Sequence, residues 1–148
     1  EASWGPEPDL DRLRMEVTHN RLITLVQGGS LDEADALLRG PGARAVLGES
    51  DWMDLSVYVV QERAQAAARQ GGDAAGIEAV AGGIAALGRQ AELLRMFEVY
   101  VHNAFARLYN AGRLDEARAI LARGLGIHPA SAMMARDKAT LDGRAPSP

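Results

Sequence analysis

The sequence predicts an all-α protein made of stacked antiparallel helical hairpins, and three observations support that prediction. Residues that favour helix (Ala, Leu, Arg, Glu, Gln, Met and Lys) make up 80 of the 148 residues, whereas Val, Ile and Thr make up 17. Glycine-rich breaks separate segments whose apolar residues fall at helical spacing. One block of sequence recurs along the chain. Because the expected turns are short, successive helices should be antiparallel neighbours.

The first helix is expected from Leu10 to the Gly28-Gly29 pair, after a tail of residues 1–9 in which Asp9 can act as the helix cap. A stripe of apolar residues at helical spacing predicts the face of this helix that points into the core. The stripe consists of Leu10, Leu13, Val17, Leu22, Leu25 and Val26.

The second helix is expected to begin at Leu31, because Ser30 and Glu33 form a capping-box pattern. In a capping box the Ser hydroxyl and the Glu carboxylate each accept a hydrogen bond from a free backbone N–H at the helix start. The helix should stop at Gly40-Pro41-Gly42, and the short segment 43–47 then leads to the next helix.

The middle of the chain predicts two helices, from about Asp51 to Gln70 and from Ala74 to Leu87, separated by Gly71-Gly72-Asp73. A long fifth helix follows, from about Arg89 to Asn110. It has the clearest amphipathic pattern in the chain, with a predicted core stripe of Leu93, Phe97, Val101, Ala104, Phe105 and Leu108.

The C-terminal part predicts a sixth helix from Leu114 to about Gly124 and a seventh from Ala130 to Leu141, before a tail of residues 143–148. The seventh helix is expected to cap the array, with an apolar side formed by Met133, Met134 and Leu141. Its charged residues Arg136, Asp137 and Lys138 are expected to point away from that side.

A repeat connects the two ends of the chain. A shift of 83 residues aligns His19–Gly40 with His102–Arg123, with ten of 22 positions identical. A shift of 43 residues superimposes Gln27-Gly28-Gly29 on Gln70-Gly71-Gly72, which indicates a degenerate middle copy. The domain predicted over residues 10–142 therefore has repeats at about 10–48, 50–88 and 89–128, followed by a capping helix at 130–142.

The third copy resembles a tetratricopeptide repeat (TPR). Ala117 stands where the two helices of that motif cross, Leu121 supplies the large apolar residue four positions later, and Pro129 follows at the end. The resemblance implies a right-handed superhelical stack of the three hairpins. The middle copy departs from the motif, since bulky Ile77 replaces the expected Ala. The period also exceeds the usual TPR length of about 34 residues, so a HEAT-like array remains an alternative.

Composition excludes several classes of protein. The chain has no cysteine, which rules out disulfides and thiolate metal sites. Its net charge of −4 argues against nucleic-acid binding, and no apolar run reaches the length of about 18 residues that a membrane span needs. The compartment stays open: cytoplasmic, or periplasmic or exported if a leader was removed before Glu1.

No catalytic motif and no cofactor motif is present, so we expect neither an enzyme nor a cofactor. His19 and His102 could form a metal pair with Glu16 or Glu98, but they belong to separate repeats, so no metal site is expected. The acidic pairs Asp32-Glu33 and Asp115-Glu116 lie in the first turns of their helices. Negative charge there offsets the helix dipole.

The TPR resemblance implies a concave groove lined by the first helix of each hairpin. Carried over residue by residue, its predicted lining is His19, Asn20, Glu62, Arg63, His102, Asn103 and Tyr109. An Asn side chain can hold an extended peptide, because it both donates and accepts hydrogen bonds. The sequence therefore predicts a non-catalytic protein–protein interaction module, a monomer or weak homo-oligomer, with a protein or peptide as its partner. The alternative is an accessory or regulatory repeat domain of a larger enzyme or regulator.

Overall fold

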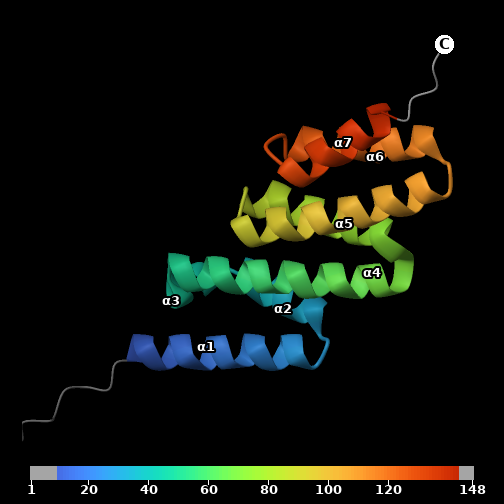
Figure 1. Cartoon of the computed structure of the whole chain (residues 1–148). Helices are drawn as coiled ribbons and strands as arrows, with labels where there is room; N and C mark the ends of the chain where they lie inside the picture. Colours follow the sequence, from blue (N-terminus) through green and yellow to red (C-terminus); the bar gives the residue numbers. More distant parts are fainter. Residues whose placement is uncertain (1–9, 144–148) are drawn as a thin grey trace, which may run out of the picture. The chain divides into compact units, whose positions relative to one another are not determined.

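Residues 10–143, the part of the chain that the computed structural model describes, consist of helices joined by short connections and contain no strand (Figure 1). The seven helices of this part are α1 (Leu10–Gln27), α2 (Leu31–Arg39), α3 (Ala43–Leu47), α4 (Glu49–Leu87), α5 (Ala91–Asn110), α6 (Leu114–Ile127) and α7 (Ala132–Gly143). The all-α prediction is confirmed for these residues. The predicted N-terminal tail with its cap Asp9, and the C-terminal tail after Gly143, lie outside them.

The chain divides into two compact units, Glu1–Glu62 and Arg63–Pro148, which we call unit 1 and unit 2. The boundary between them falls inside α4. In its described residues, unit 1 therefore holds α1, α2, α3 and the beginning of α4, and unit 2 holds the rest of α4 with α5, α6 and α7.

The core of unit 1 forms where α1, α2, α3 and the beginning of α4 meet. Its buried side chains are Leu22, Val26, Ala34, Leu38, Leu47, Leu55 and Val59. Trp52 lies against this core and donates a hydrogen bond from Nε1 to the Leu38 carbonyl at 2.9 Å. Because Trp52 is only partly buried, its ring also meets the Arg44 guanidinium, which lies 4.4 Å from the ring centroid.

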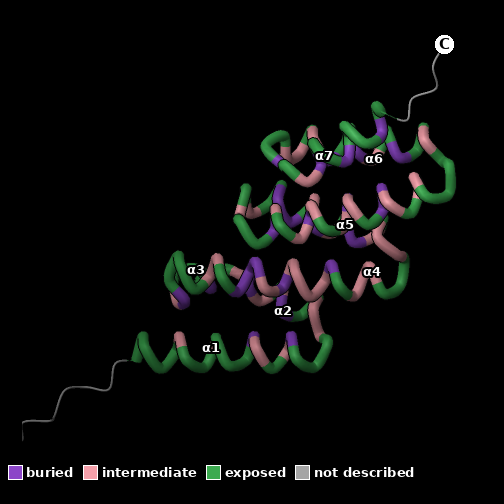
Figure 2. The backbone as a smooth tube through the Cα atoms, in the orientation of Figure 1, coloured by how far each residue is buried: buried purple, intermediate pink, exposed green. Residues whose placement is uncertain are grey.

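The N-terminal half of the α1 stripe is not part of this core, which corrects the sequence prediction. Leu10, Leu13 and Val17 are 57%, 47% and 66% exposed, and Figure 2 shows the buried residues of α1 only in its second half. The reason is helix length: α2 has nine residues and α3, which also packs on α1, has five, against 18 in α1. Since α2 folds back from the C-terminal end of α1, at about 1.5 Å per residue it can cover only about half of its partner.

The α1–α2 turn of unit 1 and the α5–α6 turn of unit 2 have the same backbone geometry. In each turn, a glycine with positive φ follows the first helix, and the next residue donates its N–H to the carbonyl five residues back. The glycines are Gly29 (φ 80°) and Gly112 (φ 75°), and the hydrogen bonds run from Ser30 to Leu25 (2.8 Å) and from Arg113 to Leu108 (2.9 Å). The sequence match at a shift of 83 residues is thus matched by the local structure.

The capping box predicted at Ser30 is not formed, because the Ser30 side chain makes no cap hydrogen bond. Its backbone has φ −82° and ψ 59°, close to the φ −85° and ψ 67° of Arg113 at the equivalent position. The Ser30 hydroxyl makes no cap hydrogen bond and Arg113 has no hydroxyl, so the turn backbone rather than the side chain sets the start of both helices.

The glycine pair in the middle of the chain breaks α4. Gly72 has φ 77° and ψ −170°, a conformation that is almost restricted to glycine. The chain reverses sharply here, since a Cβ placed on Gly76 would lie 3.2 Å from the Ala68 Cβ. The predicted pair of helices on either side of Gly71-Gly72 is therefore correct, although the two segments carry one label.

The core of unit 2 is built around α5. Of the predicted α5 stripe, Leu93, Phe97, Val101, Ala104 and Phe105 are buried, and Leu108 is half-buried. The partner helices add the buried side chains Ile77, Val80, Ile84, Ala117, Leu121, Met134 and Leu141. Helices α6 and α7 pack closely because Gly124 has no side chain: a Cβ there would lie 2.7 Å from Met134 Sδ.

Candidate functional site

The seven predicted groove residues are divided between the two units. Unit 1 holds His19 and Asn20 on α1, both exposed, and Glu62 on α4, which is half-buried. Unit 2 holds Arg63, His102, Asn103 and Tyr109. Of these, His102, Asn103 and Tyr109 lie on α5, where His102 and Asn103 are adjacent and Tyr109 lies about two turns further along the helix.

His102 is held by a carboxylate that the sequence analysis placed on the surface. Its Nδ1 lies 2.7 Å from Asp137 Oδ2, where the ring N–H donates and the carboxylate accepts. Asp137 is 8% exposed, so the prediction that it points away from the apolar side of α7 is wrong. It follows Met134 by three residues and precedes Leu141 by four, which places all three on the buried face of α7.

That spacing is the signal that the sequence analysis missed. A carboxylate in the buried stripe of a helix needs a polar partner, because burying it unpaired costs several kcal/mol. His102 lies next to the buried Val101 on α5 and supplies that partner.

A second histidine–carboxylate pair lies one helical turn before His102. Glu98 of α5 lies with its Oε1 3.3 Å from Nε2 of His128, the residue that follows α6, and both side chains are mostly buried. Spacing of four residues puts Glu98 and His102 on the same side of α5. Two polar links therefore fix this side of α5, one to α7 and one to the C-terminal end of α6.

Asn103 and Val99 form the exposed part of α5 beside these links. Asn103 is exposed, and Val99, one turn earlier, is 44% exposed, the only large apolar side chain exposed to this degree in the described part of unit 2. Tyr109 is half-buried, and its ring centroid lies 5.5 Å from that of Phe105. Helix α5 therefore exposes the Asn103 amide and the Val99 side chain, next to a His102 ring that Asp137 holds in place.

Ion pairs hold the second half of α4 against α5 and α6 in unit 2. Arg107 Nη2 lies 2.6 Å from Asp73 Oδ2, and Arg123 pairs with Glu78. A shallow hollow of about 540 Å³ lies beside them, lined by small, aliphatic and charged residues of α4, α5 and α6. The Asp73 carboxylate is only 14% exposed under the Arg107 side chain, whose exposure is 70%, so the cation faces solvent.

Tyr100 lies at the contact between α5 and α4, where a Cβ on Gly76 would come within 3.2 Å of its ring. Burial raises the pKa of the Tyr100 hydroxyl above its ordinary value; the Asp73 carboxylate adds to this shift and Arg69 opposes it. In unit 1, the hydrogen bond with Arg44 lowers the pKa of the exposed Glu49 carboxyl.

Within residues 10–143, no group of three or more His, Cys, Asp or Glu side chains could hold a metal ion. His19 and His102, considered in the sequence as a metal pair, belong to different units. Over the same residues, no helix combines the length and the apolar character that a membrane crossing requires.

Comparison with known proteins assigns no family: no family model, no curated protein and no solved structure matches the chain.

Proposed function

We propose that the protein is a non-catalytic interaction module that binds a protein or peptide partner, and that the outward face of α5 is the binding surface. One observation supports it above the others. The exposed Asn103 stands beside His102, whose ring is fixed by the buried Asp137, and one turn from the exposed Val99. A fixed polar neighbour lowers the entropy lost when a partner binds.

In this proposal the Asn103 amide hydrogen-bonds the backbone of the partner, since it can donate to a carbonyl and accept from an N–H. Val99, one turn before Asn103 on the same side of α5, provides an apolar contact. Tyr109 lies further along α5, half-buried against Phe105. The partner is therefore a peptide segment with at least one apolar side chain near the amide contact.

The TPR-like, right-handed superhelical arrangement expected from the sequence is part of this proposal. It is supported by the matched turns at Gly29 and Gly112 and by the burial of the paired small residues Ala34 and Ala117, both 0% exposed. The paired large residues Leu38 and Leu121 are buried as well.

The test begins with a phage-displayed library of random peptides, from which peptides that bind the full chain are selected. The affinity of each selected peptide is then measured by fluorescence anisotropy. Replacing Asn103 by Ala should weaken the selected peptides by about 5- to 30-fold, the effect of losing a hydrogen-bonding side chain at an interface centre. Gln70→Ala, which truncates another exposed amide of unit 2, is the matched control and should bind as the wild type does. Equal affinity of wild type and of the double variant Asn103→Ala/Tyr109→Ala would place the binding surface elsewhere.

A further inference from the structure

The exposed side of α5 is a single row of residues at a spacing of four. The row consists of Ala91, Arg95, Val99, Asn103 and Arg107, all of them exposed. Residues four apart form one ridge of an α-helix, inclined by about 26° to the helix axis. This ridge contains Val99 and Asn103 of the proposed binding surface and extends it by one turn in each direction, to an arginine at either end.

Arg107 faces solvent although it forms an ion pair. The guanidinium is 70% exposed, whereas the Asp73 carboxylate beneath it is 14% exposed. Only Nη2 contacts Asp73, at 2.6 Å, so Nε and Nη1 remain able to donate to a ligand. The Arg107 side chain also borders the hollow of about 540 Å³ that residues of α4, α5 and α6 line, so a ligand carboxylate has room beside it. A ligand that approaches α5 from solvent therefore meets the cation before its carboxylate partner.

Arg95, at the other end of the row, has no ion-pair partner among the residues that the structure describes. Of the two acidic residues of α5, Glu92 lies three residues earlier, in the first turn, and Glu98 pairs with His128. The row itself contains two cations and no anion. Complementary charge across an interface selects the partner and speeds its association, so this surface favours a ligand with negative charge at two points.

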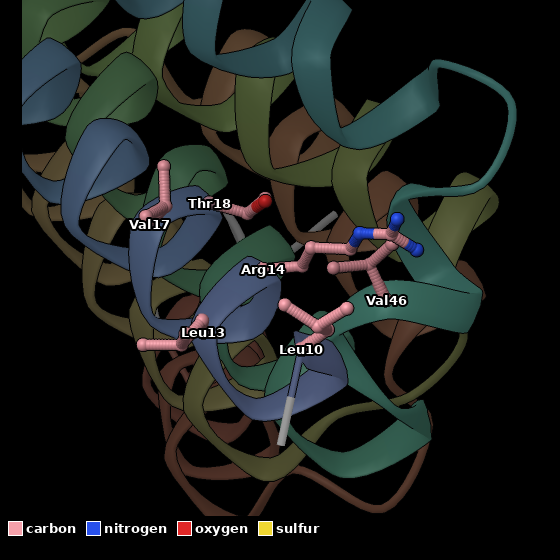
Figure 3. Close-up of a pocket in the computed structure, with 6 residues that line it drawn as sticks. All are labelled: Leu10, Leu13, Arg14, Val17, Thr18 and Val46. Carbon is pink, nitrogen blue, oxygen red and sulfur yellow. The ribbon is translucent and has the colours of Figure 1, made fainter. Parts of the chain in front are cut away.

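The hollow beside α1 in unit 1 has no comparable selectivity. It is lined by five residues of α1 and by Val46 of α3, and Arg14 is the only charged side chain among them (Figure 3). The Arg14 guanidinium lies 3.9 Å from the Asp11 carboxylate, and both side chains are exposed, so their charges offset each other. Charge therefore distinguishes the row on α5 from the apolar hollow of unit 1.

We propose that the partner is an acidic peptide segment, bound in extended form along the row from Arg95 to Arg107. This inference rests on the proposed function and names the chemistry of its partner. Successive residues of the row are about 6 Å apart along the helix axis, because the rise is about 1.5 Å per residue. Alternate residues of an extended peptide point to the same side and are about 6.6 Å apart.

The two spacings match closely enough to predict the pattern of the peptide. An acidic side chain at Arg95 and an apolar one two residues later, at Val99, fit the row. The peptide backbone then reaches the Asn103 amide. A second acidic side chain, six residues after the first, reaches Arg107.

The test uses the peptides selected on the full chain, each compared with a synthetic copy in which Asn or Gln replaces its acidic residues. The selected sequences should contain more Asp and Glu than the unselected library, with two acids about six residues apart. The amide copies should bind about 2- to 25-fold more weakly, because each of two exposed ion pairs contributes about 1.5- to 5-fold. The difference should shrink at high salt, which screens exposed charges.

Charge reversal on the protein shows whether the contact is direct. Arg95→Glu should weaken the selected peptides, and changing one of their two acids to Lys should restore the affinity. Arg118→Glu reverses an exposed arginine of α6 outside the row and should bind as the wild type does. Arg107→Gln should also weaken binding, but it removes the partner of Asp73, so circular dichroism must show that it is folded. Arg95→Glu breaks no ion pair and tests the proposal without that complication.

Failure of this inference differs from failure of the proposed function. If Asn103→Ala weakens binding but the selected peptides have no excess of acids, α5 binds a peptide that is not acidic and this inference is wrong. Selected peptides that bind Arg95→Glu and a folded Arg107→Gln as tightly as the wild type overturn it too. Equal affinity of the wild type and Asn103→Ala/Tyr109→Ala would instead overturn the proposed function, and this inference with it.

Discussion

Asp137 is enclosed between α7 and α5, and His102 Nδ1 lies 2.7 Å from its carboxylate. Replacing His102 by Ala leaves that carboxylate buried without its partner, so we expect a loss of about 1–3 kcal/mol in the free energy of unfolding, measured with urea. The double variant His102→Ala/Asp137→Ala should cost no more than His102→Ala alone, because it also removes the unpaired charge. Asn103→Ala, at the exposed neighbouring position, should stay within about 0.5 kcal/mol of the wild type. A double variant that loses the sum of two independent single losses would show that the pair does not act as a unit.

Tyr100 makes stability depend on alkaline pH. Because burial raises its pKa, the folded chain holds the phenol proton more tightly than the unfolded chain does. This stabilisation is complete below the unfolded pKa of about 10 and is lost as pH rises through the higher folded value. Urea unfolding at neutral and alkaline pH should therefore show a larger alkaline loss for the wild type than for Tyr100→Phe. The same loss in both proteins would mean that the Tyr100 hydroxyl is equally hydrated in the two states.

At the scale of elements, the close packing of α6 on α7 depends on one glycine. A Cβ on Gly124 would lie 2.7 Å from Met134 Sδ and 3.0 Å from Val101 Cγ1. Gly124→Ala should therefore lower the free energy of unfolding by about 1–3 kcal/mol, despite the better helix propensity of Ala. Gly126 lies on the same helix with nothing within 4 Å of an added Cβ, so Gly126→Ala should be neutral or stabilising by up to about 1 kcal/mol. Thermal unfolding of the two variants measures the contrast, and equal melting temperatures would contradict it.

The crossing of α5 and α6 offers a second contrast on α6. Ala117 is 0% exposed, as the repeat pattern predicted, whereas Ala122 is exposed. Ala117→Trp overpacks the core and should cost at least about 1–3 kcal/mol, while Ala122→Trp should change stability by less than about 0.5 kcal/mol. Chemical unfolding checks both, and a tolerated Trp at position 117 would show that this helix crossing is loosely packed.

Features that depend on the local chain were predictable from the sequence, and features that depend on distant partners were not. The helix breaks at Gly29, Gly72 and Gly112 follow from residues at those positions, and the structure has them there. The α1 stripe was misjudged because its burial depends on the length of α2. Asp137 lies at helical spacing from Met134 and Leu141, which indicates the buried face, but its partner His102 lies 35 residues away and could not be identified from the sequence. On α5, the sequence could indicate Asn103 as a surface amide, but it gave no sign of the carboxylate that fixes its neighbour.

At the scale of the whole molecule, the division into two compact units predicts that a core mutation in one unit destabilises mainly that unit. Leu38 belongs to the unit 1 core and is 3% exposed; Leu121, at the equivalent position of the unit 2 hairpin, is 2% exposed. Truncating either to Ala should remove about 2–5 kcal/mol from the unit that contains it. In chains of stacked helical hairpins, each hairpin contacts only its neighbours, so such a loss destabilises mainly the helices next to the mutated residue.

Amide hydrogen exchange of the full chain can separate the two effects, because it reports local opening element by element. In Leu38→Ala, amides of α1 and α2 should exchange faster while those of α5 and α6 keep their wild-type rates, and Leu121→Ala should do the reverse. Each variant serves as the control for the other, since the side chain removed is the same and the equivalent position is equally buried. If both variants accelerate exchange equally from α1 to α7, the described helices unfold as one cooperative body, and the division at Glu62 has no energetic counterpart.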